Sequence, residues 1–244
     1  MGERGLDAVG FDLDYTLWDQ DQFARSFFDQ VAGEFGRRLG LGRRRVAQAL
    51  HASLDRLTLA HPALFDFALH RLGAWDPRLV AELVDRYHRH RPPARPYPAA
   101  AELLGRLRRA GLRLFLVTDG PPELQRHKVQ ALGFQDEFAA AVYTGELPEA
   151  QRKPSPAPFL LACGRLGVAP ARCAYVGDNP ECDFAGPLGL GMLVIGVGTG
   201  PYAARASASA PAPDRRVRSL EGVAEALAAQ AALERLPACL GDRP

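Results

Sequence analysis

Short apolar runs alternate with amphipathic stretches along most of the chain. Six runs rich in β-branched or large apolar residues predict strands, at residues 8–13, 112–117, 140–143, 173–176, 192–197 and 216–218. Stretches with helical spacing of apolar positions predict helices between most of them, at 99–110, 122–132, 156–166, 181–188 and 220–236. This alternation is typical of α/β folds, in which a mostly parallel sheet carries helices on both faces.

Residues 18–95 interrupt the alternation with helical patterns alone, at 21–39, 44–60, 62–72 and 77–90. Asp76 and Pro77 are residue types favoured at a helix N-cap and in the first helical turn. We therefore expect a discontinuous, Rossmann-like core domain at 1–17 and 96–244, and a small helical cap domain at 18–95. The apolar core of the cap is expected to contain five aromatic residues, Phe27, Phe28, Phe65, Phe67 and Trp75.

Residues able to carry chemistry stand near the ends of the predicted strands, where open parallel sheets bind their ligands. They are Asp12 and Asp14 after the first strand, Thr118 and Gly120 at the second, Asp178 and Asp183 after the fourth, and Lys153 before a helix. Several strand ends thus supply carboxylates, one supplies a hydroxyl and a turn rich in backbone N–H groups, and a lysine stands nearby.

Asp12 and Asp14 fall on the same side of the chain if it stays extended, because side chains alternate along a strand. Two carboxylates that close repel each other unless a cation lies between them or one takes a proton. Clustered acids bind hard cations such as Mg²⁺, whereas hydroxyl, amide and ammonium groups hold phosphate oxygens. With these charges offset, one aspartate can attack phosphorus and the other can transfer protons.

Only two of the 30 basic residues are lysines, Lys128 and Lys153. A compact ammonium and a planar guanidinium are not interchangeable in a tight site, so a lysine in an arginine-rich chain is informative. This favours Lys153 as a site residue. Lys128 follows Gln125-Arg126-His127 on a predicted helix and is expected on its solvated face.

Four segments, DLDYT, VTDG, RKP and GDNPECD, occur in this order at the ends of alternating elements. Together they resemble the four motifs of the haloacid dehalogenase-like hydrolase superfamily, and the helical insertion resembles the small cap of the subgroup with an insertion after the first motif. The resemblance extends from Asp12 to Asp183 and rests on the ordered set, because each motif alone is a weak signal.

The resemblance implies a role for each matching residue. Asp12 is the nucleophile that forms an aspartyl-phosphate and is also a metal ligand. Asp14 is the general acid and base and gives a backbone carbonyl to Mg²⁺. Thr118 binds phosphate, with Gly120 beside it, and Lys153 steadies the nucleophile and the phosphate. Asp178 is a metal ligand. Asp183 supports the metal site without binding the metal itself, either by contacting the ligands or through a water.

Three residues depart from the usual motifs. Tyr15 stands where glycine or aspartate is common and is expected to be exposed at the entrance of the site, where it narrows the pocket. Asp119 stands where asparagine is common and is expected to point away from phosphate or to pair with an arginine. Cys182 replaces a polar residue of the fourth motif.

Composition narrows the partners. With 30 basic and 28 acidic residues, the charges nearly cancel, so neither nucleic acid nor an anionic membrane is favoured. Without a membrane-length apolar run or a signal-like start, a cytoplasmic location is expected. The four cysteines, Cys163, Cys173, Cys182 and Cys239, lack metal-site spacing and are expected to be free thiols. The oligomeric state stays open.

These observations predict a Mg²⁺-dependent phosphatase that hydrolyses a small phosphorylated metabolite through an aspartyl-phosphate. Three alternatives stay open: a metal-free dehalogenase-type hydrolase, a phosphomutase, and a non-catalytic phosphate-binding module. Asp14 and the additional carboxylates favour the phosphatase, since they supply leaving-group protonation and metal ligands.

Overall fold

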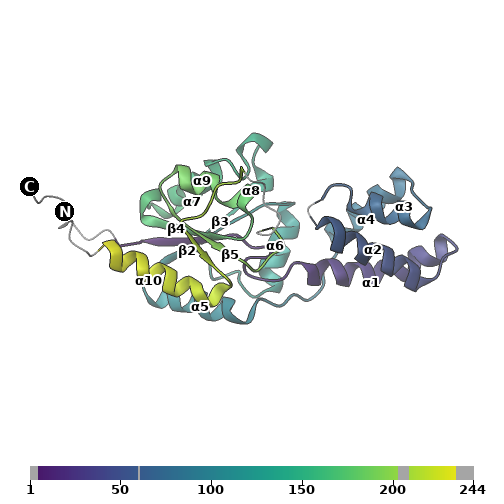
Figure 1. Ribbon diagram of the computed structural model, residues 1–244, viewed down its shortest axis with the longest axis horizontal. Helices are drawn as coiled ribbons and strands as arrows, with labels where there is room; N and C mark the ends of the chain where they lie inside the picture. The colour runs from purple at the N-terminus through teal and green to yellow at the C-terminus, as the bar shows by residue number, and fades with distance from the viewer. Residues whose placement is uncertain (1–4, 60, 203–208, 235–244) are drawn as a thin grey trace, which may run out of the picture. The chain divides into compact units, whose positions relative to one another are not determined.

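A parallel sheet forms the centre of one part of the computed structural model, which describes residues 5–59, 61–202 and 209–234 (Figure 1). Within these residues the sheet has six strands in the order β3-β2-β1-β4-β5-β6. The strands are β1 (Ala8–Phe11), β2 (Arg113–Thr118), β3 (Ala140–Tyr143), β4 (Cys173–Gly177), β5 (Leu193–Val197) and β6 (Arg215–Val217). All neighbouring pairs are parallel.

Helices cover both faces of the sheet, which confirms the predicted α/β fold class. Helices α5 (Pro98–Arg109) and α10 (Val223–Glu234) contact each other and cover one face, whereas α7 (Ala157–Leu166) and α9 (Ala185–Gly189) cover the other (Figure 1). Helix α6 (Pro122–Ala131) follows β2, and α8 (Pro180–Asp183) follows β4.

Most predicted helices end within three residues of the observed bounds, but two differ from the prediction in their internal structure. The predicted helix at 181–188 is broken between α8 and α9, because the ring of Pro187 conflicts with the carbonyl four residues earlier, at Asp183. The predicted helix at 220–236 begins with a single 3₁₀ turn, Leu220–Gly222, before α10. Residues 235 and 236 lie outside the described residues.

The central strands β1 and β4 are buried along their whole length because helices cover both faces, as is usual for parallel sheets. Phe159 of α7 packs edge-on against Tyr175 of β4, with ring centroids 4.8 Å apart. A Cβ atom on Gly10 would lie 2.2 Å from the ring of Phe115, so the glycine leaves room for this ring between neighbouring strands. The central strands are thereby held in close register, with Phe11 opposite both Leu116 and Val176.

Residues 20–94 form a separate unit, and residues 1–19 with 95–244 form the other. The unit at 20–94 contains α1 (Asp21–Arg38), α2 (Arg43–Leu57), α3 (Leu64–Leu72) and α4 (Pro77–Arg89). The predicted N-cap is confirmed, since Asp76 Oδ1 accepts a hydrogen bond of 2.8 Å from the backbone N–H of Arg78. That this unit acts as a cap domain stays a prediction, as do the exact domain boundaries.

The apolar core of the helical unit contains Phe27, Phe28 and Phe65, as predicted. Trp75 was wrongly placed there, since it is 46 % exposed. Its ring stacks on His70 and its indole N–H donates to Asp66, which keeps the polar edge of the ring at the surface. Phe67 is only partly buried.

The cysteines that the structure describes are free thiols, as predicted. Cys163 and Cys173 are buried, and their Sγ atoms lie 3.8 Å apart. Cys182 is partly buried, and Cys239 lies outside the described residues. Among the described helices, none combines the length and apolar character that crossing a membrane requires.

Candidate active site

The carboxyl ends of β2, β1 and β4 lie side by side in the sheet. Thr118 is the last residue of β2, Asp12 directly follows β1, and Asp178 directly follows β4. The backbone N–H of Asp12 still donates to the carbonyl of Val176, at 2.9 Å, so the chain leaves β1 in line with its neighbour. Strand order thus brings together three residues that are far apart in the sequence.

Three buried carboxylates, those of Asp12, Asp178 and Asp183, form the acidic trio. One oxygen from each lies within 4.8 Å of the others. Lys153 Nζ donates to Asp12 Oδ1 at 2.7 Å and to Asp183 Oδ1 at 2.8 Å. Asp183, expected only as a support, therefore lies as close to the cluster as the expected metal ligands.

Further donors hold two members of the trio. Asp183 Oδ2 accepts the backbone N–H of Asn179 at 2.9 Å, and Asp178 Oδ1 accepts the hydroxyl of Thr16 at 3.4 Å. Asp178 Oδ2 is buried and has no hydrogen-bond partner within the described part of the chain. A buried carboxylate oxygen without a donor is costly, and a bound cation would remove that cost.

Burial and the charges of neighbouring groups shift the pKa values of Asp12 and Asp178. Burial raises the pKa of Asp12 to about 7, against the lowering effect of Lys153 and with a further rise from Asp183. Burial, with the charges of Asp12 and Asp183, raises the pKa of Asp178 well above its usual value. Burial acts to lower the pKa of Lys153, but Asp12 and Asp183 raise it well above its usual value. One ammonium therefore faces more negative charge than it offsets.

Asp14 lies in a second, separate network of donors. Its Oδ1 accepts from Trp18 Nε1 at 2.9 Å and its Oδ2 accepts from Gln125 Nε2 at 3.0 Å. Lys128 Nζ contacts both oxygens, at 3.0 and 2.7 Å. Asp12 and Asp14 thus have different lysine partners, because the extended strand ends at Phe11 and the chain turns after Asp14.

The prediction that Lys128 lies on a solvated helix face was wrong, since only 2 % of the residue is exposed. Lys128 and Gln125 are three residues apart on α6 and point inward with Leu124 and Val129. Two features of the sequence could have indicated that Lys128 is buried, namely the scarcity of lysine and the three-residue spacing from Gln125. They indicate this only when α6 is known to lie beside Asp14.

The residues predicted to bind phosphate, Thr118 and Gly120, lie at the end of β2 and just after it. Thr118 is buried, and its Oγ1 accepts from Gln125 Nε2 at 2.6 Å. Gly120 has a φ of 123°, a conformation that residues with a side chain rarely adopt. Asp119, the unusual acid of this motif, is hydrogen-bonded to the hydroxyl of Thr144 rather than to an arginine.

Tyr15 is only 2 % exposed, so the expectation of an exposed residue at the entrance was wrong. Its φ of 59° turns the chain after Asp14, and its ring packs edge-on against Tyr202 at 5.6 Å. The loop after β5 also reaches the acidic trio. A Cβ atom on Gly200 would lie 1.9 Å from Asp178 Oδ2 and 2.6 Å from Tyr15 Cβ. Sequence reasoning assigned no role to this glycine.

Cys182 is not placed for acid-base chemistry. Its Sγ lies 3.6 Å from Asn179 Nδ2, next to the backbone that holds Asp183. Burial raises the pKa of Cys182 to about 12, so the thiol stays protonated near neutral pH. A neutral thiol adds no further negative charge to the acidic trio.

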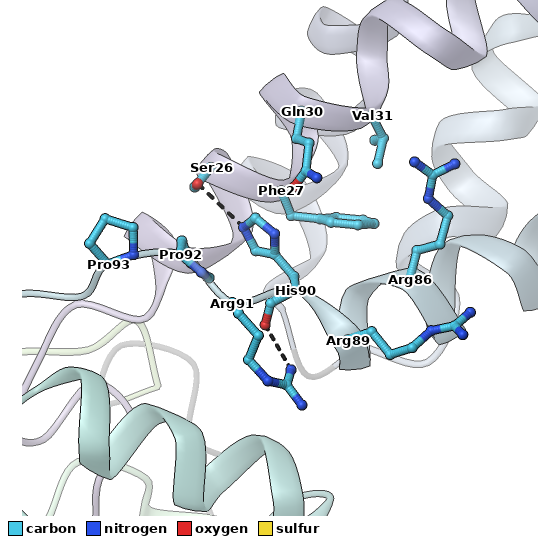
Figure 2. Close-up of a pocket in the computed structure, with 10 residues that line it drawn as sticks. All are labelled: Ser26, Phe27, Gln30, Val31, Arg86, Arg89, His90, Arg91, Pro92 and Pro93. Atoms are coloured by element: carbon cyan, nitrogen blue, oxygen red, sulfur yellow. Dashed lines mark hydrogen bonds between the residues drawn. The ribbon is translucent and has the colours of Figure 1, made fainter.

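The helical unit contains a pocket of about 550 Å³ whose charged lining residues are arginines rather than carboxylates (Figure 2). Its lining residues are Ser26, Phe27, Gln30, Val31, Arg86, Arg89, His90, Arg91, Pro92 and Pro93. Arg86 pairs with both oxygens of Glu34, and Arg89 pairs with Asp85. Arg91 donates to the backbone carbonyls of His88 and His90. These arginines have partners inside the unit, which favours a structural role over anion binding.

Comparison with known proteins identifies the class of enzyme. Residues 6–191 match the family model described as haloacid dehalogenase-like hydrolase, so the chain belongs to this family, as its motifs predict. It is similar to glyceraldehyde 3-phosphate phosphatase of Methanopyrus kandleri, with 33% identity over 195 residues that cover 78% of this chain and 83% of the relative. It is also similar to phosphoserine phosphatase of Thermus thermophilus, with 38% identity over 123 residues that cover 50% of this chain and 48% of the relative. The prediction of an enzyme in the phosphatase branch of the family is thereby confirmed.

Solved structures show the same fold. A HAD phosphatase from Thermococcus onnurineus superposes with a TM-score of 0.62 and 26% identity, covering 91% of this chain and 98% of the other. A 2-haloacid dehalogenase from Pseudomonas syringae pv. Tomato superposes with a TM-score of 0.59 and 27% identity, covering 92% and 99%. Since both chemistries occur on this fold, the residues of the site must distinguish them.

Proposed function

We propose that the protein is a Mg²⁺-dependent phosphatase that hydrolyses a small phosphomonoester through an aspartyl-phosphate on Asp12. The observation that carries this proposal is the acidic trio around Lys153, at the same sheet edge as Thr118. Three buried carboxylates with a single ammonium suit a reaction in which a divalent cation and a phosphate complete the charge balance.

The residues of the trio fit a hard cation. Their ligand atoms are carboxylate oxygens, they lie close together, and Asp178 Oδ2 has no donor within the described residues. Asp12, Asp178 and the backbone carbonyl of Asp14 are the proposed ligands, with Asp183 acting directly or through a water. When bound, Mg²⁺ offsets negative charge on the phosphate oxygens and on these acids.

The remaining groups have distinct tasks in the proposed reaction. Because Lys153 holds Oδ1 of Asp12, Oδ2 is the oxygen that attacks phosphorus. The hydroxyl of Thr118 and the backbone N–H groups near Gly120 hold phosphate oxygens. Asp14 gives a proton to the leaving oxygen as its bond to phosphorus breaks, and then takes a proton from the water that attacks the aspartyl-phosphate.

The relatives suggest where to look for the substrate. Glyceraldehyde 3-phosphate phosphatases of Methanopyrus kandleri and Pyrococcus abyssi match over 78% of this chain, whereas the match to phosphoserine phosphatase covers 50%. We therefore propose a small phosphorylated metabolite as substrate, with glyceraldehyde 3-phosphate as the first to test. The cytoplasmic location stays a prediction.

A dehalogenase-type hydrolase is the second candidate, because a 2-haloacid dehalogenase has the same fold over nearly the whole chain. That reaction also needs an aspartate nucleophile, but it needs neither a protonated leaving group nor a cation. The acidic trio and the donor network of Asp14 favour the phosphatase.

The test is a panel of substrates with Mg²⁺ and with EDTA. It includes glyceraldehyde 3-phosphate, phosphoserine, phosphoglycolate and 2-chloropropionate, and a hexose monophosphate assayed for isomerisation covers the phosphomutase. We expect Mg²⁺-dependent phosphate release, and a loss on the order of 10³-fold or more in Asp12→Asn, which removes the nucleophile. Turnover of the haloacid in EDTA, or phosphatase activity that survives Asp12→Asn, would overturn the proposal.

A further inference from the structure

Two buried side chains of α6, Gln125 and Lys128, connect groups that the proposed reaction uses for different purposes. Gln125 contacts both Thr118 and Asp14, and Lys128 contacts both oxygens of Asp14. Both side chains are almost fully buried although both are strongly polar. Burying such groups is costly unless they make specific hydrogen bonds, which these do.

Gln125 determines the direction in which Thr118 donates. Its amide nitrogen lies 2.6 Å from Thr118 Oγ1 and 3.0 Å from Asp14 Oδ2. The NH₂ group of an amide side chain only donates hydrogen bonds. The Thr118 oxygen is therefore the acceptor of the amide, so its own hydrogen is available for a third group such as a phosphate oxygen.

Lys128 holds the carboxylate of Asp14 from one side. Its ammonium lies 3.0 Å from Oδ1 and 2.7 Å from Oδ2, and it lies 5.8 Å from the centre of the Trp18 ring. Trp18 also donates to Oδ1, so the indole fixes the position of both partners. Because one ammonium contacts both oxygens, it can keep one oxygen while the other exchanges a proton with the leaving group.

We propose that Lys128 and Gln125 are positioning residues of the phosphatase reaction, which hold the carboxylate of Asp14 and the hydroxyl of Thr118 for proton transfer and phosphate binding. This inference rests on the proposed function. In the first step the proton moves from Asp14 to the leaving oxygen, while Asp12 bonds to phosphorus. In the second step a proton of the attacking water moves to Asp14, and the bond between phosphorus and Asp12 breaks.

The test compares leaving groups in the presence of Mg²⁺. The kcat/KM values of wild type, Lys128→Met and Lys128→Arg are measured with p-nitrophenyl phosphate, phenyl phosphate and the best alkyl phosphate of the panel. Because kcat/KM reports formation of the aspartyl-phosphate, it depends on protonation of the leaving oxygen. Misplacing Asp14 is expected to lower kcat/KM of Lys128→Met by roughly 10²-fold for the alkyl phosphate. For p-nitrophenyl phosphate, whose leaving group needs little proton transfer, we expect kcat/KM of Lys128→Met to fall by about threefold or less.

Two further variants separate positioning from folding. Lys128→Arg keeps the charge and is expected to recover much of the loss. In the background of Asp14→Asn, adding Lys128→Met should lower kcat/KM for the alkyl phosphate by no more than about twofold, because Lys128 acts through Asp14. This double variant has no unpaired buried charge, so it remains informative if Lys128→Met alone folds poorly. Thermal unfolding is measured for every variant.

Gln125→Glu is expected to weaken inhibition by inorganic phosphate about tenfold, because the new carboxylate accepts the Thr118 hydrogen and repels Asp14. Gln130→Glu introduces the same charge on the exposed face of α6 and is the matched control.

Three results would overturn the inference. The first is that Lys128→Met lowers kcat/KM by the same factor for every leaving group. The second is that Lys128→Met lowers kcat/KM as much in the Asp14→Asn background as in wild type. The third is that Gln125→Glu and Gln130→Glu change inhibition by inorganic phosphate to the same extent. A wild type that releases no phosphate from any substrate would instead overturn the proposed function and this inference with it.

Discussion

Two buried lysines bind aspartates that are two residues apart in the sequence: Lys153 contacts Asp12, and Lys128 contacts Asp14. The surroundings of the two lysines differ. Lys153 contacts Asp12 and Asp183, with Asp178 nearby, so one ammonium faces three buried carboxylates. Lys128 contacts both oxygens of Asp14, which also accepts from the neutral donors Gln125 and Trp18. The lysine side chains are equally inaccessible, at 3 % and 2 % exposure.

The difference lies in charge balance. The Lys153 cluster has more carboxyl groups than ammonium groups, and burial together with the neighbouring acids raises the pKa of Asp12 and of Asp178. The Lys128 cluster pairs one acid with one base and adds neutral hydrogen bonds. The first arrangement is suited to accept a cation, and the second is suited to hold a single carboxylate in place.

The largest effect is expected from removing the ammonium of the unbalanced cluster. Lys153→Met leaves buried carboxylates without their only lysine, which should destabilise the protein by about 3–5 kcal/mol. Excess Mg²⁺ should restore part of this stability, since it supplies positive charge. Urea unfolding with Mg²⁺ and with EDTA measures both. A Mg²⁺ effect of the same size in Lys128→Met would contradict the comparison.

Neutralising one acid in each cluster should have opposite effects on stability in EDTA. Asp14→Asn removes the carboxylate that pairs with the buried ammonium of Lys128 and should destabilise by about 3 kcal/mol. Asp178→Asn removes a carboxylate disfavoured by burial and by its neighbours, and should stabilise by about 1 kcal/mol. Both should lose activity. The free energy of unfolding in denaturant measures both effects. If Asp178→Asn is less stable than wild type, the acidic trio does not carry more negative charge than its surroundings offset.

The unbalanced cluster should also make the stability of the metal-free protein depend on pH. The pKa of Asp12 rises from 3.8 to about 7 on folding, chiefly through burial, so the folded state binds the proton more tightly. Its stabilising contribution is complete below pH 3.8 and is lost as the pH rises to about 7. The slope from this group is at most about 1.4 kcal/mol per pH unit.

Unfolding in EDTA across this pH range tests the expectation, with Asp12→Asn as the control that lacks the titrating group. Saturating Mg²⁺ should flatten the dependence, because the cation competes with the proton. An identical pH profile in wild type and Asp12→Asn would assign the dependence to other groups.

The smallest effect is expected at Gly200, which lies against the trio without contributing a functional group. A Cβ atom there would meet Asp178 Oδ2, so Gly200→Ala should weaken Mg²⁺ activation by roughly tenfold. Gly189→Ala is the matched control, since nothing lies within 4 Å of its added Cβ atom. Activity is measured against Mg²⁺ concentration, and equal midpoints in the two variants would show that Gly200 has no influence on the metal site.

Much of the core fold could be predicted from the sequence. All six strands and the helices between them follow from local apolar spacing, and the rule that ligands bind at carboxyl ends pointed to Asp12, Thr118 and Asp178. The break between α8 and α9 was missed because an apolar pattern does not register the steric effect of Pro187. Trp75 was misplaced because a large aromatic residue can keep a polar edge at the surface.

The sequence by itself determined which acids and which hydroxyl end the strands and which lysine precedes α7, because these positions depend on the local pattern of each element. Only the tertiary structure decided how they are paired. Lys128 and Asp14 are 114 residues apart, and they meet because β2 lies next to β1 and carries α6 to that edge of the sheet. The same packing buries Tyr15 and brings Gly200 against Asp178. Burial and charge pairing are properties of all neighbours in space, and no local pattern contains them.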